Sequence, residues 1–425
     1  MSVFTKASSR SQKIGRLGGL ALLTASALVL AGCAAGTTAD PSESAAPAPG
    51  GEPIVSDLTL KIGTILPQSG QLAYLGPPEE AGVQLAVNEI NEANMGIKVE
   101  ATFRDSGDTT TDIATISATD LLAAGVTSIV GAASSAVSFN IIDKITDAGV
   151  LQISPANTSP DFTDYDDGGL YFRTAPSDLL QGEVLANQIA EDGKSALGMI
   201  VLNDPYGTGL AASLKENYEA AGGKVVSEAL FNEGDTTFDA QISTVMAAKP
   251  DAIAVITFEQ AKVIIPALVA AGAPNDSMYL VDGNLADFSA DFEPGTLEGS
   301  KGTQPGPALS ADFHDKLMAI DPTLKNFNYA AESYDAVVLL ALAALAAQDT
   351  SGKAMAGKMV EVSGGSGDGT KATTFADAAK IILDGGVADY DGPSGPITFN
   401  EKGDPTEAAI GIFQYQKDNT IKRIN

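Results

Sequence analysis

The sequence predicts an α/β protein built from parallel sheets that carry helices on both faces. Short apolar runs recur along the chain, and helical patterns separate most of them, which is the order expected of βαβ units. The chain has 425 residues, of which 44% are hydrophobic. This length suits two domains of ordinary size, and the composition is sufficient to fill a core in each.

The elements follow one another in a regular order. A strand is expected at 58–62, where apolar residues alternate with polar ones. A helix is expected to begin at Pro77, because proline is tolerated in the first turn and the acids that follow favour the positive end of a helix. Val83, Val87 and Ile90 then repeat at helical spacing on one face. Further strands are predicted at 128–130, 150–153, 197–202, 225–230, 252–256 and 278–281.

The first 33 residues form a separate segment. Four basic residues precede an apolar stretch at 17–30, which is too short to be a comfortable membrane span. The stretch ends in Leu30-Ala31-Gly32-Cys33, which resembles the lipobox of bacterial lipoproteins. We therefore expect a signal peptide at 1–33 and lipidation of Cys33. The alternative is an ordinary secretory signal with an incidental cysteine, but the chain holds no other cysteine.

Two further stretches bear on anchoring. Residues 34–53, AAGTTADPSESAAPAPGGEP, are small, polar and rich in proline and glycine. Such a sequence buries too little apolar area to order itself, so we expect a flexible tether. The alanine-rich stretch 336–347 is too short to span a membrane and predicts a buried helix.

Charge and composition exclude several classes of function. The chain has 54 acidic and 25 basic residues and a net charge of -29. Nucleic acid is therefore not an expected partner, because a phosphate footprint needs a basic surface. His314 is the one histidine, and no cysteine follows Cys33. Histidine triads, thiol catalysis and common zinc sites are poor hypotheses, so we expect no metal and no cofactor.

Hydrogen-bonding residues follow two neighbouring predicted strands. The strand at 128–130 runs into Gly-Ala-Ala-Ser134-Ser135, and the strand ending at Ile153 runs into Ser-Pro-Ala-Asn-Thr-Ser. Loops at the carboxyl ends of parallel strands share one edge of the sheet, where ligands bind. Ser134 or Ser135 is expected to cap a helix over about 136–148, whose free amides make an anion site. The plain alternative is that both loops are only turns and caps.

Several runs together resemble one family. They are LKIGTILPQSGQLAYLGPPEEAGVQLAVNEIN, GVLQISPANTSPDFTD, NDPYGTGLA and GPITFNEKGD. In order and spacing they are similar to the leucine/isoleucine/valine-binding protein family, the extracytoplasmic amino-acid receptors of ABC importers. The resemblance implies a type I periplasmic binding protein: two doubly wound parallel-sheet lobes joined by a three-stranded hinge. Projected here, lobe 1 holds 54–175 and 304–391, and lobe 2 holds 176–303 and 392–425.

The resemblance also implies a ligand site. The family's carboxylate-binding serine falls on Ser135, and its SPxxT loop, which grips carboxylate and ammonium, places Ala156 and Thr158 at the ligand. Its second-lobe tyrosine falls on Tyr206, and the acid that pairs with the ammonium falls on Asp282. The predicted ligand-binding residues are Ser135, Ala156, Thr158, Tyr206, Asp282, Tyr74, Leu75, Ser134, Thr257 and Phe258.

Some of these positions concern the ligand side chain. The resemblance places Tyr74, Leu75, Thr257 and Phe258 beside it. Two positions depart from the family pattern: Asp282 stands where glutamate occurs, and Thr257 stands at an aromatic position. Both departures leave the identity of the amino acid open.

We therefore expect a lipid-anchored receptor on the extracytoplasmic face of the bacterial membrane. It would be a monomer that captures a branched-chain or related amino acid and delivers it to an ABC permease. Two alternatives stay open: a tethered sensor of the same fold, and a receptor for a small amide or an aromatic acid. An enzyme is not expected, because no pair of carboxylates stands out at two strand ends facing one cleft.

Overall fold

A computed structural model of the protein describes residues 53–425. The predicted signal peptide, Cys33 and nearly all of the predicted tether lie outside the described residues.

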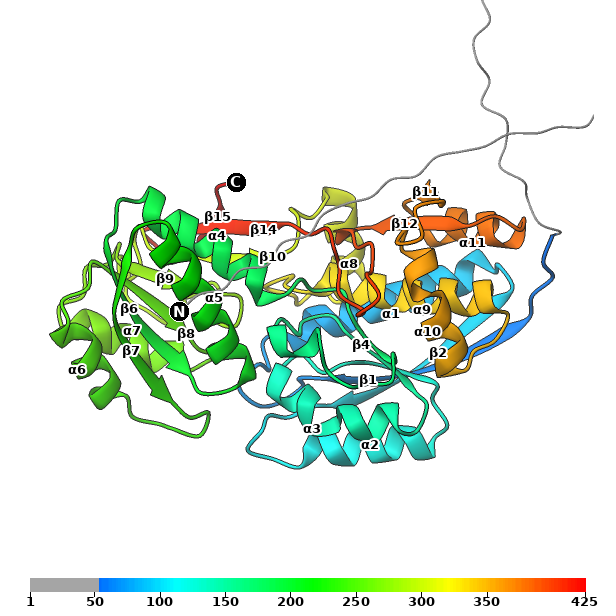
Figure 1. The fold of residues 1–425 in the computed structure, drawn as a ribbon, viewed down its shortest axis with the longest axis horizontal. Coiled ribbons are helices and arrows are strands. Elements are labelled where there is room, and N and C mark those ends of the chain that lie inside the picture. Colours follow the sequence, from blue (N-terminus) through cyan, green and yellow to red (C-terminus); the bar gives the residue numbers. More distant parts are fainter. Residues whose placement is uncertain (1–52) are drawn as a thin grey trace, which may run out of the picture. The chain divides into compact units, whose positions relative to one another are not determined.

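The first sheet has five parallel strands in the order β2-β1-β3-β4-β5. Helices α2 and α3 cover one face, and α1 and α9 cover the other (Figure 1). We call this sheet and its helices the first lobe. Its elements are β1 (Leu58–Leu66), α1 (Gly76–Ala93), β2 (Ile97–Asp105), α2 (Ile113–Ala123), β3 (Ser128–Gly131), α3 (Ser135–Thr146), β4 (Leu151–Ser154), a 3-10 turn (Pro160–Phe162), β5 (Tyr171–Arg173) and α9 (Ala330–Ala347).

The second sheet has seven strands in the order β15-β14-β10-β9-β8-β6-β7. The run from β10 to β7 is parallel, and β14 and β15 add an antiparallel edge. We call this sheet and its helices the second lobe. Its elements are α4 (Asp178–Glu191), β6 (Ala196–Leu202), α5 (Pro205–Ala220), β7 (Lys224–Phe231), α6 (Asp239–Ala247), β8 (Ala252–Ile256), α7 (Ala261–Ala270), β9 (Met278–Leu280), β10 (Lys301–Pro305), β14 (Ile410–Tyr415) and β15 (Ile421–Arg423).

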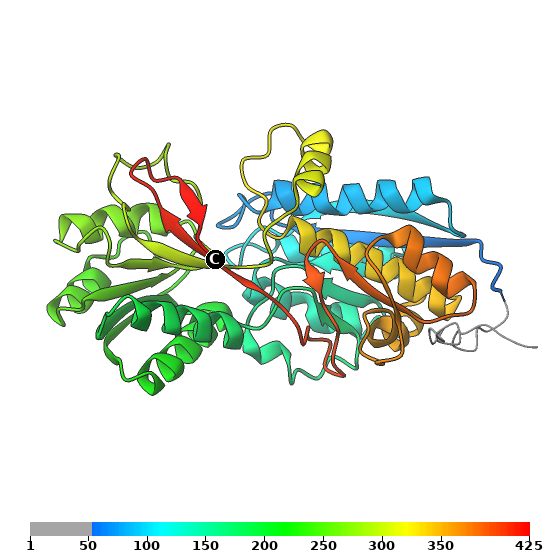
Figure 2. The ribbon, with the colours of Figure 1, turned by 90° about the horizontal axis from the view of Figure 1, so that it is seen from above.

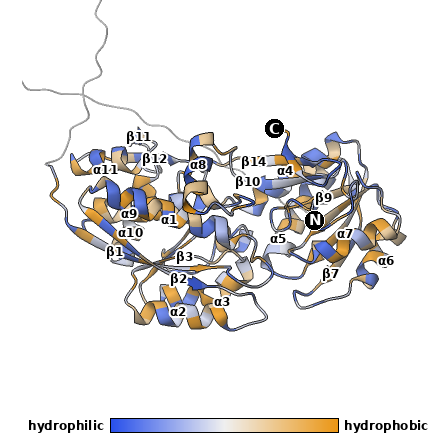
Figure 3. Cartoon of the chain, turned by 180° about the vertical axis from the view of Figure 1, so that it is seen from behind, coloured by the Kyte–Doolittle hydropathy of each residue, from blue (hydrophilic) through white to orange (hydrophobic). Residues whose placement is uncertain are grey.

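The remaining elements pack around the first lobe. Ile397 and Phe399, which follow the last of these elements along the chain, belong to the same hydrophobic core as α9. Helices α10 and α11 carry both hydrophobic and hydrophilic residues, as expected of helices with one face on a core (Figure 3). These elements are α8 (Ala311–Ile320), α10 (Gly352–Val362), β11 (Thr370–Ala372), α11 (Phe375–Leu383), β12 (Ala388–Gly392) and β13 (Gly395–Pro396).

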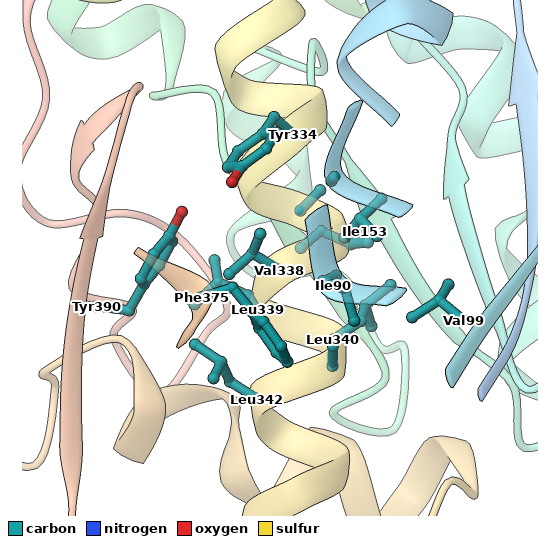
Figure 4. Close-up of a cluster of buried hydrophobic side chains, with 14 of the residues drawn as sticks. Ile90, Val99, Ile153, Tyr334, Val338, Leu339, Leu340, Leu342, Phe375 and Tyr390 are labelled. Carbon is teal, nitrogen blue, oxygen red and sulfur yellow. The ribbon is translucent and has the colours of Figure 1, made fainter. Parts of the chain in front are cut away.

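Helix α9 is the central helix of the first lobe. Every residue from Ala330 to Leu345 is buried. Figure 4 shows Val338, Leu339 and Leu340 of this helix amid side chains from other elements, among them Ile90 and Ile153. Among residues 53–425, α9 is the one helix long and apolar enough to cross a membrane, yet 89% of that window is buried inside the fold. The predicted buried helix at 336–347 is confirmed.

The chain crosses between the lobes three times, after β5, after β10 and after β13. The second and third crossings touch, because Gly306 N donates to Ala409 O over 2.8 Å. β10 and β14 pair side by side in the second sheet, and Figure 2 shows the chain running from each of them toward the first sheet. This arrangement is the predicted three-stranded hinge. The exact lobe boundaries proposed from the sequence stay a prediction.

Candidate functional site

The two polar loops of the first sheet are tied to each other. Ser154 Oγ at the end of β4 donates to Ala132 O over 2.7 Å. Asn157 Nδ2 donates to Ala132 O over 3.0 Å and to Ala133 O over 2.8 Å. Ser154 Oγ also accepts from Asn157 N over 2.9 Å. The donors after β4 therefore fix the position of the loop after β3, and part of the polar cluster serves structure.

Two serines of these loops lie at the start of α3, and Thr158 lies in the loop after β4. Ser134 is the N-cap of the helix, and its hydroxyl accepts from Val137 N over 3.4 Å. Ser135 Oγ accepts from Ser159 N over 3.4 Å. Thr158 Oγ1 is buried and has no hydrogen-bond partner. Free amides at a helix start favour a negative group, so this edge of the first lobe suits an anion.

An acid of the second lobe lies opposite the start of α3. Asp282 lies just past β9, and only 3% of its surface is exposed. Tyr206 Oη and Gln181 Nε2 donate to its Oδ1 over 2.7 and 2.9 Å. Tyr329 Oη donates to its Oδ2 over 2.6 Å. Three donors therefore hold this carboxylate in one orientation.

A second buried acid stands behind Asp282. Gln181 Nε2 also donates to Asp178 Oδ1 over 3.0 Å, so one amide bridges both carboxyls. Burial raises the pKa of Asp282, while its three side-chain donors oppose the shift by stabilising the charged form. Burial, and then the charge of Asp282, raises the pKa of Asp178 well above its usual value. A cation placed beside Asp282 would relieve this excess of negative charge.

These groups enclose one small cavity between the lobes, which we call the interlobe cavity. It leaves about 20 Å³ for the centres of water-sized spheres. That is room for about one water molecule and not for an amino acid. The residues that line it are Leu72, Leu75, Ala133, Ser134, Ser135, Ala156, Tyr206, Phe258, Asp282, Gly283 and Tyr329.

Most of the predicted site residues meet at this cavity. Those that line it are Ser134, Ser135, Ala156, Tyr206, Asp282, Leu75 and Phe258. Tyr74 lies next to it, with its hydroxyl donating to Asp282 O over 3.0 Å. Thr257 lies behind it, with Oγ1 accepting from Asn284 Nδ2 over 2.8 Å. Thr158 is buried in its loop and does not border the cavity. The ligand roles of all ten residues stay predictions.

Two residues of the site were missed from the sequence. Tyr329 is the residue just before α9 and has φ of +60°, a left-handed conformation that is uncommon for a residue other than glycine. Its hydroxyl reaches Asp282 from the other lobe, 47 residues away in the chain. Gln181 looks like an ordinary polar residue of α4. No local pattern marks either one, because their role depends on contacts between distant segments.

The chain was compared with known families and proteins. The profile of the periplasmic binding protein family matches residues 59–420. A leucine-, isoleucine-, valine-, threonine- and alanine-binding protein of Pseudomonas aeruginosa is 34% identical over 189 residues, 44% of this chain and 50% of that protein. Leu/Ile/Val-binding protein homolog 1 of Brucella suis is 27% identical over 369 residues, 85% of this chain and 91% of that protein. The chain spans only about half the length of the first two curated relatives it matches, 50% and 53%.

Solved structures share the fold. A branched-chain amino acid transporter substrate-binding protein of Streptococcus pneumoniae in complex with isoleucine has a TM-score of 0.68 at 22% identity, covering 86% of this chain and 99% of that one. A solute-binding protein of R. palustris in complex with benzoate has a TM-score of 0.69 at 19% identity, covering 86% and 96%. The fold is that of a type I periplasmic binding protein, and the predicted resemblance is confirmed: the chain belongs to the periplasmic binding protein family and is similar to its Leu/Ile/Val-binding members.

Proposed function

We propose that this protein is the extracytoplasmic solute receptor of an ABC importer and that it holds a branched-chain or related amino acid between its lobes. One observation carries the proposal. Asp282 of the second lobe and the start of α3 in the first lobe border the same interlobe cavity. An anion and an anion-binding edge are therefore placed at opposite sides of one small space, which suits the two poles of an amino acid.

The chemistry of the two poles supports this ligand class. A zwitterion that leaves water needs donors for its carboxylate and a negative charge for its ammonium. Hydroxyls and amides of Ser134, Ser135 and Ala156 are the proposed carboxylate partners, and Asp282 is the proposed ammonium partner. Hydrogen bonds to charged groups contribute about 1.5 to 3 kcal/mol each, so a few of them are enough for micromolar affinity near about -8 kcal/mol.

The size of the interlobe cavity fits a hinged receptor. About 20 Å³ is too little for any amino acid. Binding would therefore require the lobes to move apart and then to close on the ligand. The three crossings supply the hinge for such a motion, which a ligand stabilises through contacts made from both lobes.

Two alternatives have their own support. One solved relative binds benzoate, and the stacked rings of Tyr206 and Phe258, with centroids 5.3 Å apart, could hold an aromatic acid. Asp282 argues against it, because a benzoate has no cation for that carboxylate. A chemotactic substrate-binding protein of Halobacterium salinarum is 25% identical over 364 residues, which favours a sensor of the same fold. Loss of uptake in a deletion strain would favour import, and loss of a behavioural response alone would favour sensing.

The anchor and location complete the proposal. Lipidation of Cys33, tethering through 34–53 and placement outside the cytoplasm agree with the family's extracytoplasmic role. Partner permease subunits and a monomeric state are proposed with it. A Cys33→Ser variant that stays in the membrane fraction would contradict the lipid anchor.

The decisive experiment is a thermal-shift series on the purified protein, because a ligand held only by the native state raises the melting temperature. Leucine, isoleucine or valine should raise it. Asp282→Asn should weaken their binding at least about a hundredfold, since the ammonium would lose its charged partner. Asp276→Asn, an exposed acid before the same strand, is the matched control. A shift with benzoate and none with any amino acid would replace the proposal by the aromatic-acid alternative.

A further inference from the structure

A larger cavity lies at the second hinge crossing, and we call it the hinge cavity. Its volume is about 440 Å³, within the range of small-molecule sites. Glu332 in the first turn of α9 lines it from the first lobe, and Leu285, Phe413 and Ile421 line it from the second. Gly306 of the second crossing borders it too. Its walls therefore come from both lobes and from the hinge.

The carboxyl of Glu332 is the notable group in this wall. The residue is only 4% exposed, and no other residue in the described part of the chain donates a hydrogen bond to its side chain. It stands against the hinge, because a Cβ added at Gly306 would lie 2.7 Å from Glu332 Oε1. Thr174 of the first crossing donates to Glu332 O over 2.9 Å. The backbone of Glu332 is thus held in place, and no side chain of the described residues supplies a donor to its carboxyl.

A buried amide also lines the same cavity, and it makes no hydrogen bond. Gln304 of β10 is 6% exposed, and neither its side-chain nitrogen nor its oxygen makes a hydrogen bond. Buried polar side chains are nearly always satisfied, and each exception asks for an explanation. Gln304 is one such exception, and it lines the same cavity as Glu332. Burial raises the pKa of Glu332 to about 8, which is the behaviour of a carboxyl without a cation beside it.

The side chains that line the cavity indicate which kind of ligand it suits. A positively charged N–H donor beside the carboxyl of Glu332 would stabilise the charged form of this carboxyl. Two cations, Lys325 and Arg423, also line the cavity, but neither forms an ion pair with Glu332. The guanidinium of Arg423 donates from Nη1 to Gly306 O over 3.1 Å and from Nε to Asn425 O over 3.3 Å. The apolar side chains of Leu285, Phe413 and Ile421 suit a hydrocarbon body. A protonated amine on a small apolar body meets both demands.

The hinge cavity is separate from the interlobe cavity. Tyr329 borders both, and its hydroxyl donates to Asp282 on the interlobe side. The two spaces therefore share one wall and have different acids, Asp282 in one and Glu332 in the other.

We propose that the hinge cavity is a second ligand site, which binds a small organic ammonium ion through Glu332 and couples its occupancy to the separation of the lobes. A molecule that contacts both lobes and the second crossing stabilises one hinge angle over others. By linkage, it then changes the affinity at the interlobe cavity, and an interlobe ligand changes its affinity in return.

The test uses benzylammonium as the probe and benzyl alcohol as its neutral counterpart, titrated by calorimetry into the full folded protein. Benzylammonium should bind at one site, and benzyl alcohol at least about tenfold more weakly. Glu332→Gln should weaken benzylammonium at least about tenfold, while Asp282→Asn should leave it unchanged within about twofold. Ile421→Trp, which narrows the cavity from β15, should also abolish binding, and it covers the case in which the Glu332 variant folds poorly.

Two results would overturn the second site: equal binding by wild type and Glu332→Gln, or loss of binding in Asp282→Asn. The second result would place the probe in the interlobe cavity. Leucine binding in the thermal-shift series tests the proposed function independently, so each proposal can fail while the other stands.

Discussion

Arg173 Nε donates to Asp404 Oδ1 over 2.6 Å in a buried ion pair that joins the first hinge crossing to the third. Arg173 Nη1 also donates to Ser159 O over 2.6 Å, so the same guanidinium holds the end of the loop after β4. One fully buried side chain therefore ties the hinge to the loop that carries Ala156 and Thr158.

Arg173→Met should destabilise the protein by about 3 to 5 kcal/mol, because removing one partner of a buried pair leaves the other charge uncompensated. Denaturant unfolding followed by circular dichroism measures this loss. Lys402→Met is the matched control, since Lys402 pairs with Asp164 in a pair whose side chains are 56% and 86% exposed. Such a pair contributes less than about 1 kcal/mol. Equal losses in the two variants would contradict the assigned role of Arg173.

Tyr329→Phe should weaken amino-acid binding at neutral pH by about tenfold, because the Asp282 carboxylate loses one of three donors. The lost donor favoured the charged form, so its removal raises the pKa of Asp282 further. The difference in amino-acid affinity between wild type and Tyr329→Phe should therefore shrink as the pH rises from 6 to 8.5. Affinity titrations at several pH values check it. Tyr415→Phe removes a buried hydroxyl that donates to Ala286 O and should leave affinity unchanged. A deficit independent of pH would contradict this explanation.

The sequence predicted the buried parallel strands well, for a physical reason. Strands such as β8 and β9 are covered on both faces and read as continuous apolar runs. Strand β2 was missed because it lies at an edge, with charged residues such as Lys98 and Glu100 facing outward. Strand β10, KGTQP, was missed as well. Its strand conformation comes from hydrogen bonding to β9 and β14 on either side. Its own composition does not predict a strand.

The residues of the site also fall into two groups, those that the sequence predicted and those that it did not. The meeting of the two loops that carry Ser134, Ser135 and Ala156 was predicted because loops at the carboxyl ends of neighbouring parallel strands share one edge of the sheet. The ligand roles of Ser135 and Ala156 came from the family resemblance and stay predictions. Asp282 and Tyr206 were predicted through the family resemblance. Tyr329 and Gln181 reach Asp282 across 47 and 101 residues of chain, and nothing near them in sequence indicates that approach.

Gly131→Ala should destabilise the protein by at least about 1 kcal/mol more than Gly149→Ala. Both glycines have a positive φ, +120° and +75°. A Cβ at Gly131 would lie 2.1 Å from Ile65 O, whereas a Cβ at Gly149 would meet nothing within 4 Å. Both substitutions place a Cβ on a residue with a positive φ, which costs conformational free energy. Only Gly131→Ala also pushes that Cβ into the backbone of Ile65, at the start of the loop that leads to Ser134. Melting temperatures of the two variants, compared with wild type, test the difference.

The protein should lose stability as the pH rises from 6 to 8.5, and Glu332 should account for part of the loss. Burial raises the pKa of Glu332 to about 8 and that of nearby Asp335 to about 7. A carboxyl whose pKa is higher in the folded than in the unfolded state stabilises the fold while protonated. Its contribution is full below the unfolded pKa and disappears as the pH passes the folded one, at about 1.4 kcal/mol for each pH unit between them.

Glu332→Gln should therefore keep more of its stability at pH 8.5 than wild type does, because the neutral amide cannot ionise. Unfolding free energies at pH 6 and pH 8.5 measure the effect, and the difference between these values should shrink by about 1 kcal/mol or more. Glu407→Gln, at an exposed position, should behave as wild type. Asp335 remains in both variants, so some pH dependence should persist. An unchanged difference in Glu332→Gln would mean that this carboxyl is already charged in the folded protein at pH 6.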